Sequence, residues 1–252
     1  MKRWWPWGVV AAVGVLAFGL AWWWVAIADD DGAAASSGKA TRVLFVGDSI
    51  TGSPGCWRAS VWTSVTDAGH DVDMVGIRDV DECGGVRNAA GELWDPDHAG
   101  IGGATTAATF VRIARDGLIR ETTPDVVVLL IGTNDLWGHQ PAERVLPQFP
   151  VLLDAIRADA PRAAVVVGTV LPLSASACSD CQPEIDAVNA ALPAWAREAS
   201  TPESPVTLVA VHEGFDAEAD TYDGAHPNAT GDAKLAAAFT PALLDALEAR
   251  AG

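Results

Sequence analysis

The sequence predicts an α/β fold in which a five-stranded parallel sheet lies between two layers of helices. Two observations lead to this prediction. Short runs in which every residue is apolar alternate along the chain with longer stretches whose apolar residues recur at helical spacing. A strand that is apolar at every position must be buried on both faces, so these runs fit a parallel sheet covered on each side by helices.

Expected strands and expected helices follow one another along the chain. The strands are predicted at residues 42–47, 72–76, 125–131, 163–170 and 206–211. The helices are predicted at residues 56–68, 104–120, 141–159, 183–199 and 231–249. Pro141 and Pro183 suit the first turn of a helix, where the missing N–H is not needed. This order predicts a flavodoxin-like three-layer α/β/α sandwich over residues 42–250, without a second domain.

An N-terminal hydrophobic helix is expected before this domain. Lys2 and Arg3 are followed by an uncharged stretch from Trp4 to Ala28, which is 25 residues and long enough to span a bilayer. Tryptophans near both ends and positive charge before the stretch fit a membrane anchor over residues 1–28. The stretch ends in Ala26-Ile27-Ala28, which has the pattern of small residues found at signal-peptide cleavage sites, so a signal peptide cleaved after Ala28 is the alternative. Both alternatives place the domain outside the cytoplasm.

The composition of the chain predicts a linker, a class of partner to exclude and the redox state of the compartment. Residues 29–41 are rich in small and acidic residues and predict a flexible linker. The net charge of −17 disfavours nucleic acid as a partner, because phosphate binding needs a basic surface. The cysteines fit an oxidising compartment, with Cys56–Cys83 and Cys178–Cys181 the favoured pairs because each pair lies in neighbouring loops or one loop. A zinc site is the alternative, and the oligomeric state stays open.

Polar side chains follow three of the expected strands. Ser49 comes directly after the first strand, Asn134 follows the third, and Asp223 and His226 lie in the loop after the last. Ligands bind at the carboxyl ends of the strands in such sheets. A serine nucleophile needs a base to take its proton and a third group to orient that base. We therefore predict Ser49 as nucleophile, His226 as base and Asp223 as its orienting group; a turn and a helix cap are the alternative for the last two.

The attacked carbonyl becomes an oxyanion and needs donors already aimed at it. The backbone N–H groups of Ser49 and Gly103 and the side-chain amide of Asn134 are the candidates. Gly103 lacks a Cβ, which allows close approach of a substrate. A turn or cap is the alternative role for Asn134. Asp48 and Asp135, beside these groups, are expected to hold the loops by hydrogen bonds.

Four blocks taken together resemble the SGNH (GDSL-type) hydrolases. The blocks are Gly47-Asp48-Ser49, Ala99 to Gly103, Gly132-Thr133-Asn134-Asp135 and Asp223 to His226. The resemblance covers about residues 42 to 249. It implies a catalytic triad of Ser49, Asp223 and His226, an oxyanion hole from Ser49, Gly103 and Asn134, and no metal or organic cofactor.

Within that family, the chain is most similar to the branch of acetyl xylan esterases and related carbohydrate deacetylases. The similarity lies in residues 47–51, Arg58 and residues 222–228. The branch usually reads His-Glu-Gly-His-Pro-Gly where this chain has His98-Ala99-Gly100-Ile101-Gly102-Gly103. The resemblance implies an esterase that removes small acyl groups, above all acetyl, from carbohydrate through an acyl-enzyme on Ser49, and the N-terminal segment predicts that it acts outside the cytoplasm. An O-acyltransferase acting on glycan, a lipid esterase or lysophospholipase, and a non-enzymatic glycan-binding module are the alternatives.

Three further residues are expected at the catalytic edge of the sheet. Trp94, His98 and Trp137 fall in loops there and are candidate substrate contacts. Aromatic faces at such positions can stack on a sugar ring or an acyl chain. Packing of the loops is the alternative for the tryptophans. A loop hydrogen bond, or a cation site with Asp95 and Asp97, is the alternative for His98.

Overall fold

The structure is a computed structural model that describes residues 39–52 and 54–251. The expected hydrophobic helix at 1–28, and residues 29–38 of the expected linker, lie outside these residues. Among the helices that are described, none combines the length and the apolar character that a bilayer span requires.

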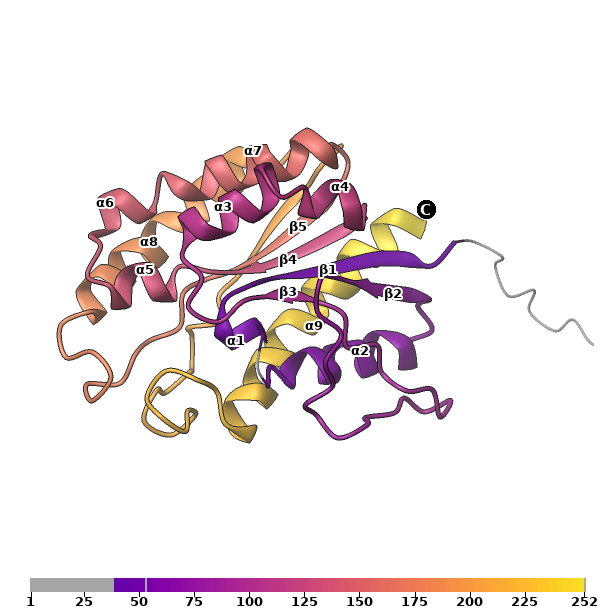
Figure 1. Ribbon diagram of the computed structural model, residues 1–252, viewed down its shortest axis with the longest axis horizontal. Helices are drawn as coiled ribbons and strands as arrows, with labels where there is room; N and C mark the ends of the chain where they lie inside the picture. Colours follow the sequence, from indigo (N-terminus) through magenta and orange to yellow (C-terminus); the bar gives the residue numbers. More distant parts are fainter. Residues whose placement is uncertain (1–38, 53, 252) are drawn as a thin grey trace, which may run out of the picture. The chain divides into compact units, whose positions relative to one another are not determined.

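A parallel sheet forms the centre of the domain (Figure 1). Its long strands are β1 (Thr41–Gly47), β2 (Val72–Val75), β4 (Val126–Leu130), β5 (Ala164–Gly168) and β6 (Val206–Val209). They lie in the order β2-β1-β4-β5-β6, and every pairing is parallel. This is the strand order of flavodoxin-like sheets, with the switch in chain direction between β1 and β4. The predicted five-stranded parallel sheet is confirmed.

The β1–β4 register sets the position of the site. Gly47 at the end of β1 pairs with Leu130 at the end of β4. The segments that leave these two strands therefore start side by side, at the switch point where α/β sheets bind ligands. A short strand β3 (Ala99–Gly100) pairs with the end of β1 and brings a third segment to the same place.

Helices cover both faces of the sheet. They are α1 (Ser49–Gly52), α2 (Trp57–Asp67), α3 (Thr106–Ala114), α4 (Leu118–Thr122), α5 (Thr133–Trp137), α6 (Ala142–Val145), α7 (Gln148–Asp159), α8 (Gln182–Ala199) and α9 (Ala229–Ala251). Helices α2 and α9 lie on one face, and α3, α4, α7 and α8 lie on the other (Figure 1).

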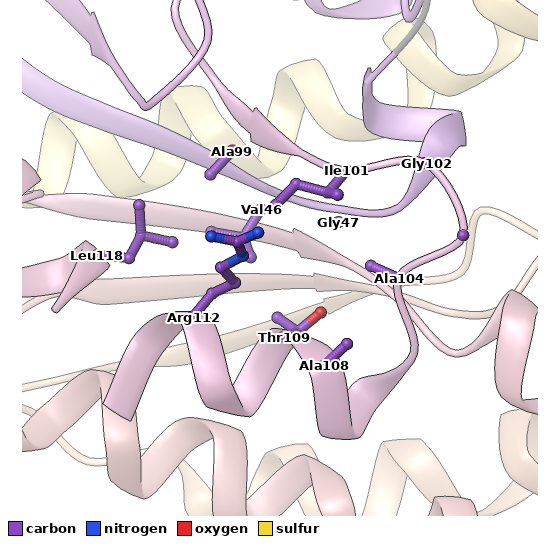
Figure 2. Close-up of a pocket in the computed structure, with 11 residues that line it drawn as sticks. Val46, Gly47, Ala99, Ile101, Gly102, Ala104, Ala108, Thr109, Arg112 and Leu118 are labelled. Atoms are coloured by element: carbon purple, nitrogen blue, oxygen red, sulfur yellow. The ribbon is translucent and has the colours of Figure 1, made fainter. Parts of the chain in front are cut away.

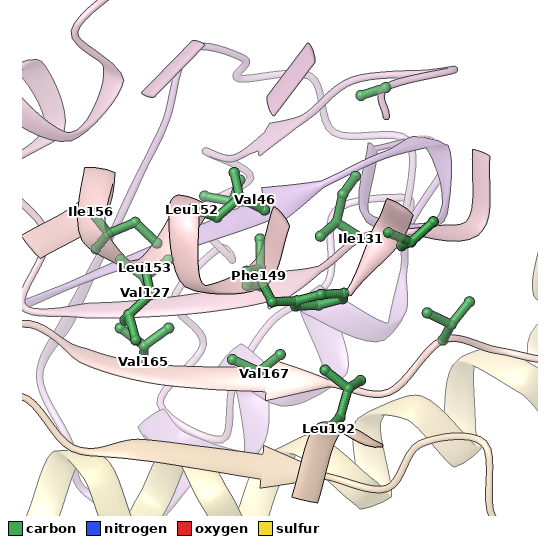
Figure 3. Close-up of a cluster of buried hydrophobic side chains, with 14 of the residues drawn as sticks. Val46, Val127, Ile131, Phe149, Leu152, Leu153, Ile156, Val165, Val167 and Leu192 are labelled. Atoms are coloured by element: carbon green, nitrogen blue, oxygen red, sulfur yellow. The ribbon is translucent and has the colours of Figure 1, made fainter. Parts of the chain in front are cut away.

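Alternate residues of each strand enter two separate cores. In β4, Val127 and Leu129 belong to the same core as Phe149 of α7, and Figure 3 shows Val127 and Phe149 within it. Val128, between them, belongs to the core under α2 and α9, where Trp57 stacks on Phe239 at a ring-centroid distance of 4.9 Å. Successive side chains of a strand point to opposite faces, which explains why the strand is apolar at every position.

Two expected helices are each broken in two. The helix expected at 104–120 becomes α3 and α4, because Gly117 between them adopts a left-handed φ of +78°. The helix expected at 141–159 becomes α6 and α7, and the break lies at Pro147, which has no N–H to donate. The strand β3 and the short helices α1 and α5 were not predicted.

Both disulfides have the expected pairing. Cys56–Cys83 joins the start of α2 to the long loop after β2, and Cys178–Cys181 closes a short loop before α8. His139 and Asp180 lie within 4.8 Å of the second pair. Sulfurs joined in a disulfide are not the thiolates that zinc requires, so this cluster does not form the alternative zinc site.

Candidate active site

Ser49, His226 and Asp223 form a hydrogen-bonded chain. Ser49 Oγ lies 2.8 Å from Nε2 of His226, and Nδ1 of the same ring lies 2.7 Å from Oδ2 of Asp223. An ionised carboxylate only accepts hydrogen bonds, so Nδ1 of the neutral ring carries the hydrogen and Nε2 has a free lone pair. The serine hydroxyl therefore donates to a nitrogen that can take its proton.

The turn after β1 fixes the position of Ser49. Oδ1 of Asp48 accepts from the N–H of Ile50 at 2.9 Å, and the indole N–H of Trp57 donates to the Ile50 carbonyl at 2.9 Å. Arg58, which is 1% exposed, donates from Nε to the carbonyl of Thr51 at 2.7 Å. The buried face of α2 thus holds the serine turn through two side-chain donors.

A braced loop carries Asp223 and His226. The carbonyl of Gly224 accepts from the N–H of Ser174 at 2.8 Å, and the N–H of Gly224 donates to Oγ1 of Thr221 at 2.7 Å. Both carboxylate oxygens of Asp223 are used, because Oδ1 accepts from the backbone N–H of His226 at 2.8 Å. A spacing of three residues therefore allows the aspartate to bind the histidine twice.

The charge of Asp223 suits an orienting group. Burial alone would raise the pKa of this carboxyl, but hydrogen bonds from the backbone and ring of His226 and from the N–H of Ala225 outweigh it and lower the pKa. The carboxylate stays ionised at neutral pH and can stabilise the imidazolium that forms when His226 takes a proton.

The three candidate oxyanion donors lie on segments that follow neighbouring strands, Ser49 after β1, Gly103 after β3 and Asn134 after β4. Ser49 is the first residue of α1, so its N–H has no acceptor within the helix. Asn134 Nδ2 donates to the carbonyl of Ala104 at 3.0 Å, which places the amide next to Gly103 and leaves its second hydrogen available. Gly103 adopts a φ of +73°, a conformation that favours glycine. This arrangement can bind an oxyanion.

Asp135 ties the segments of these donors together. Its Oδ2 accepts from the N–H of Thr106 and its Oδ1 from the hydroxyl of Thr106, both at 2.8 Å. The start of α3 is thereby fixed to α5, and Gly103 is fixed near Asn134. The hydrogen bonds expected of Asp48 and Asp135 are confirmed.

Asn134→Ala is expected to lower kcat by about 100- to 1000-fold with little change in KM, because an oxyanion donor acts mainly in the transition state. Steady-state hydrolysis of p-nitrophenyl acetate measures this change. Gln140→Ala removes another amide from the loop that follows α5 and is the control expected to keep full activity. An Asn134→Ala enzyme with unchanged kcat would exclude the amide from the oxyanion hole.

Asp48 is a buried carboxyl with a displaced pKa. Burial raises its pKa from 3.8 to about 7, against the opposing effects of the Ile50 N–H and the nearby His226. Between these two values the folded chain keeps a proton that the unfolded chain has lost. Stability is therefore expected to fall as pH rises through this window, by about 4 kcal/mol at most.

Asp48→Asn is expected to remove this pH dependence, since an amide does not ionise and its oxygen can still accept from Ile50. The difference in free energy of unfolding between the variant and the parent should therefore grow by about 2–3 kcal/mol, in favour of the variant, from pH 5 to pH 8. Urea unfolding of both proteins at the two pH values measures the gain. Asp154→Asn makes the same charge change at an exposed position of α7 and should show no such gain. A stability difference between Asp48→Asn and the parent that is the same at pH 5 and pH 8 would contradict the raised pKa of Asp48.

A pocket of about 220 Å³ opens beside Ser49. Its walls are Ser49, Gly52, Arg78, Val80, Glu82, His98, Gly100 and Gly102. Tyr222, which is 61% exposed, stacks on His226 at a ring-centroid distance of 5.7 Å. No role for Arg78, Val80 or Tyr222 was predicted from the sequence. Only the place of Tyr222 beside the Asp223 block was visible in the sequence.

Of the three residues that were expected to contact substrate, only His98 lines the pocket at Ser49. The prediction for Trp94 is wrong, because the ring is 4% exposed and lies under the guanidinium of Arg58 at 5.1 Å. Trp137 is half-buried, does not line the pocket at Ser49, and donates to the carbonyl of Ala177 at 3.1 Å.

His98 lines the pocket, with Nδ1 accepting from the N–H of Gly100 at 3.0 Å. Burial, together with Arg58 and Arg78, lowers its pKa to about 3. The ring is therefore neutral and supports the loop that carries Gly103.

Comparisons with known proteins agree with this geometry. A family model described as the GDSL-like Lipase/Acylhydrolase family matches residues 45–234. An acetyl esterase variant, solved with an acetate ion, is similar to the chain with 33% identity and a TM-score of 0.72, covering 82% of this chain and 98% of its own. A family 3 carbohydrate esterase from Talaromyces cellulolyticus has 34% identity and a TM-score of 0.72, with the same coverage of 82% and 98%.

One curated relative is much longer than this chain. A multidomain esterase from Ruminococcus flavefaciens is 27% identical over 218 residues, which is 79% of this chain and 28% of the relative. The chain thus spans little more than a quarter of that protein's length.

Proposed function

The chain belongs to the GDSL-like lipase/acylhydrolase (SGNH) family and is an esterase, and from this premise we propose that it removes acetyl groups from carbohydrate outside the cytoplasm. The observation that carries the proposal is the chain of hydrogen bonds from Ser49 Oγ through His226 to Asp223, at 2.8 and 2.7 Å. It lies at the sheet edge where the segments that carry the proposed oxyanion donors Gly103 and Asn134 also begin.

The proposed reaction has two halves. Ser49 Oγ attacks the ester carbonyl while Nε2 of His226 takes its proton, and the oxyanion is bound by the N–H groups of Ser49 and Gly103 and by Asn134. The acyl-enzyme forms when the sugar oxygen leaves with the proton from His226. Water, activated by the same nitrogen, then releases the acid and restores the serine.

Pocket size and neighbouring structures support an acetyl group on a sugar. The pocket of about 220 Å³ beside Ser49 has backbone walls at Gly52, Gly100 and Gly102, and it carries polar groups rather than a long apolar channel. Tyr222 presents an exposed ring next to His226, where a sugar can stack. Two of the similar structures are an acetyl esterase and a family 3 carbohydrate esterase.

The extracytoplasmic location is part of the proposal. Lys2 and Arg3 before the uncharged stretch from Trp4 to Ala28 support export, with the segment either retained as an anchor or cleaved. The two disulfides also support it, because such bonds persist in oxidising compartments.

A substrate screen tests the proposal. Acetylated xylo-oligosaccharides and p-nitrophenyl esters of two, four and eight carbons are offered to the full chain, with Ser49→Ala as control. We expect acetate release from the oligosaccharides and rates that fall as the acyl chain lengthens. Preference for the eight-carbon ester would indicate a lipid esterase. Transfer of acetyl to an added sugar instead of water would indicate an acyltransferase.

A further inference from the structure

A second cavity lies between helix α3 and strand β1, apart from the pocket at Ser49 (Figure 2). It has a volume of about 190 Å³. Ser49, Asn134 and His226 do not line it, and Gly102 is the residue whose surface faces both this cavity and the pocket at Ser49. The proposed reaction leaves this cavity without a role.

The cavity has an apolar interior. Its walls include Val46, Ala99, Ile101, Ala104 and Leu118. These side chains come from β1, β3, the loop after it and α4, and they surround the space above α3 (Figure 2). An engineered apolar cavity of about 150 Å³ accepts benzene, so this one has room for a ligand with about six heavy atoms.

Two polar groups on α3 face this apolar space. Thr109 is 3% exposed, and its hydroxyl has no hydrogen-bond partner among the residues that the structure describes. Other helical threonines, such as Thr122, donate to the carbonyl four residues earlier. The Thr109 oxygen is not one of the fully buried polar atoms that lack a partner, so its hydroxyl is open to the cavity that it lines, where a ligand can hydrogen-bond to it (Figure 2).

Arg112 supplies positive charge at the same cavity. It follows Thr109 by three residues, so both side chains lie on one face of α3. Its Nη1 contacts Oδ2 of Asp116 at 3.2 Å. Its Nε and Nη2 make no hydrogen bond within the described part of the chain, and the guanidinium lies near Val46 and Leu118 (Figure 2). Two donor nitrogens of this side chain, which is 49% exposed, therefore remain for an anion.

We propose that this cavity binds a short-chain carboxylate of about four carbons. The apolar tail would lie against the walls, and the carboxylate would accept from the Thr109 hydroxyl and from the free nitrogens of Arg112. A planar guanidinium matches a carboxylate in geometry and charge. A neutral ligand of the same shape would lack the charge that attracts the guanidinium, whose existing ion pair with Asp116 engages Nη1 alone.

A ligand in the cavity would contact the loop that carries Gly103, a proposed oxyanion donor. Gly102 and Gly103 form part of its wall, and no other atom lies within 4 Å of the position that a Cβ of either residue would take. A bound carboxylate would therefore pack against a loop that carries a proposed oxyanion donor. Ester hydrolysis releases carboxylates, so the site can sense acid products; binding itself does not rest on the proposed function.

Titration of the ¹⁵N-labelled full chain with sodium butyrate tests the proposal, using the Ser49→Ala background so that turnover plays no part. We expect amide shifts at Gly102, Gly103 and Thr109. Arg112→Gln and Thr109→Val should each raise the Kd about tenfold or more, since hydrogen bonds to charged groups contribute that much. Thr109→Ser should bind like the parent, and Arg115→Gln is the matched arginine control. Butyramide should bind at least tenfold more weakly than butyrate.

Other outcomes of the titration would overturn the proposal. Shifts confined to residues 49, 134 and 226, and retained in Arg112→Gln, would place the anion in the pocket at the serine instead. Equal binding of butyramide and butyrate would remove the role of the guanidinium. An absence of shifts at Gly102, Gly103 and Thr109, with Thr109→Ser folded normally, would show that the cavity does not bind this class of ligand.

Discussion

Ser49→Ala is expected to lower kcat for p-nitrophenyl acetate by about 10⁵- to 10⁶-fold, the size of effect that loss of the nucleophile has in serine hydrolases. The variant lacks the Ser49 hydroxyl, whose Oγ lies 2.8 Å from Nε2 of His226. Its N–H, and hence the oxyanion donor at this position, remains. Substrate binding should change little, because the removed hydroxyl is a small part of the pocket wall.

Steady-state kinetics with purified parent and variant measure this loss. Ser64→Ala, at an exposed position of α2, removes an equivalent hydroxyl and should keep full activity. Far-UV circular dichroism shows whether the variants are folded. If Ser49→Ala retained more than about a hundredth of the parent rate, a different nucleophile would have to be sought.

Asp223→Asn is expected to lower kcat by about 10⁴-fold. The carboxylate now accepts from both the backbone N–H and the ring Nδ1–H of His226. An amide in its place can donate to Nδ1 and so favour the tautomer that carries hydrogen on Nε2. That nitrogen could then no longer take the serine proton, although the geometry would be unchanged.

Kinetics of Asp223→Asn beside Asp245→Asn separate this effect from the loss of one negative charge. Asp245 is exposed on α9 and should tolerate the change. A fall of less than tenfold for Asp223→Asn would mean that the aspartate holds the loop but does not orient the base. Asp223→Glu, which keeps the charge, should fall between the parent and the amide variant.

The sheet could be predicted because its central strands, above all β4 and β5, are runs of apolar residues. In β4, Val127 and Val128 enter different cores, so neither face has room for a polar residue. Helix interruptions were harder to predict, since the apolar spacing continues across Gly117 and Pro147. The two short helices that follow β1 and β4 were missed because they have only four and five residues, too few to show helical spacing.

The meeting of Ser49, His226 and Asp223 followed from the sequence because all three come after strands of one parallel sheet. Side chains on long loops did not follow in the same way. Trp94 was expected at the catalytic edge, but the loop after β2 is joined to α2 by Cys56–Cys83 and places the indole under Arg58. No local pattern reports such a long-range contact.

Ser49, His98 and Gly103 were predicted at the site and line the two cavities, but other residues of the site could not be predicted from the sequence. Tyr222 lies beside His226 only because the loop from Thr221 to Pro227 folds back on itself. Thr109 and Arg112 have an ordinary helical spacing, and nothing in the sequence distinguishes them from other helical pairs. Their place at a cavity depends on the small residues of the loop after β3.

Rapid quenching of the full chain with p-nitrophenyl acetate, followed by proteolysis and mass spectrometry, tests most directly whether Ser49 carries the acyl group. We predict one acetyl group on the peptide that contains Ser49, with fragmentation placing it on that serine, and none in Ser49→Ala. Acetyl on another residue, in a protein that hydrolyses the ester at its normal rate, would contradict the account.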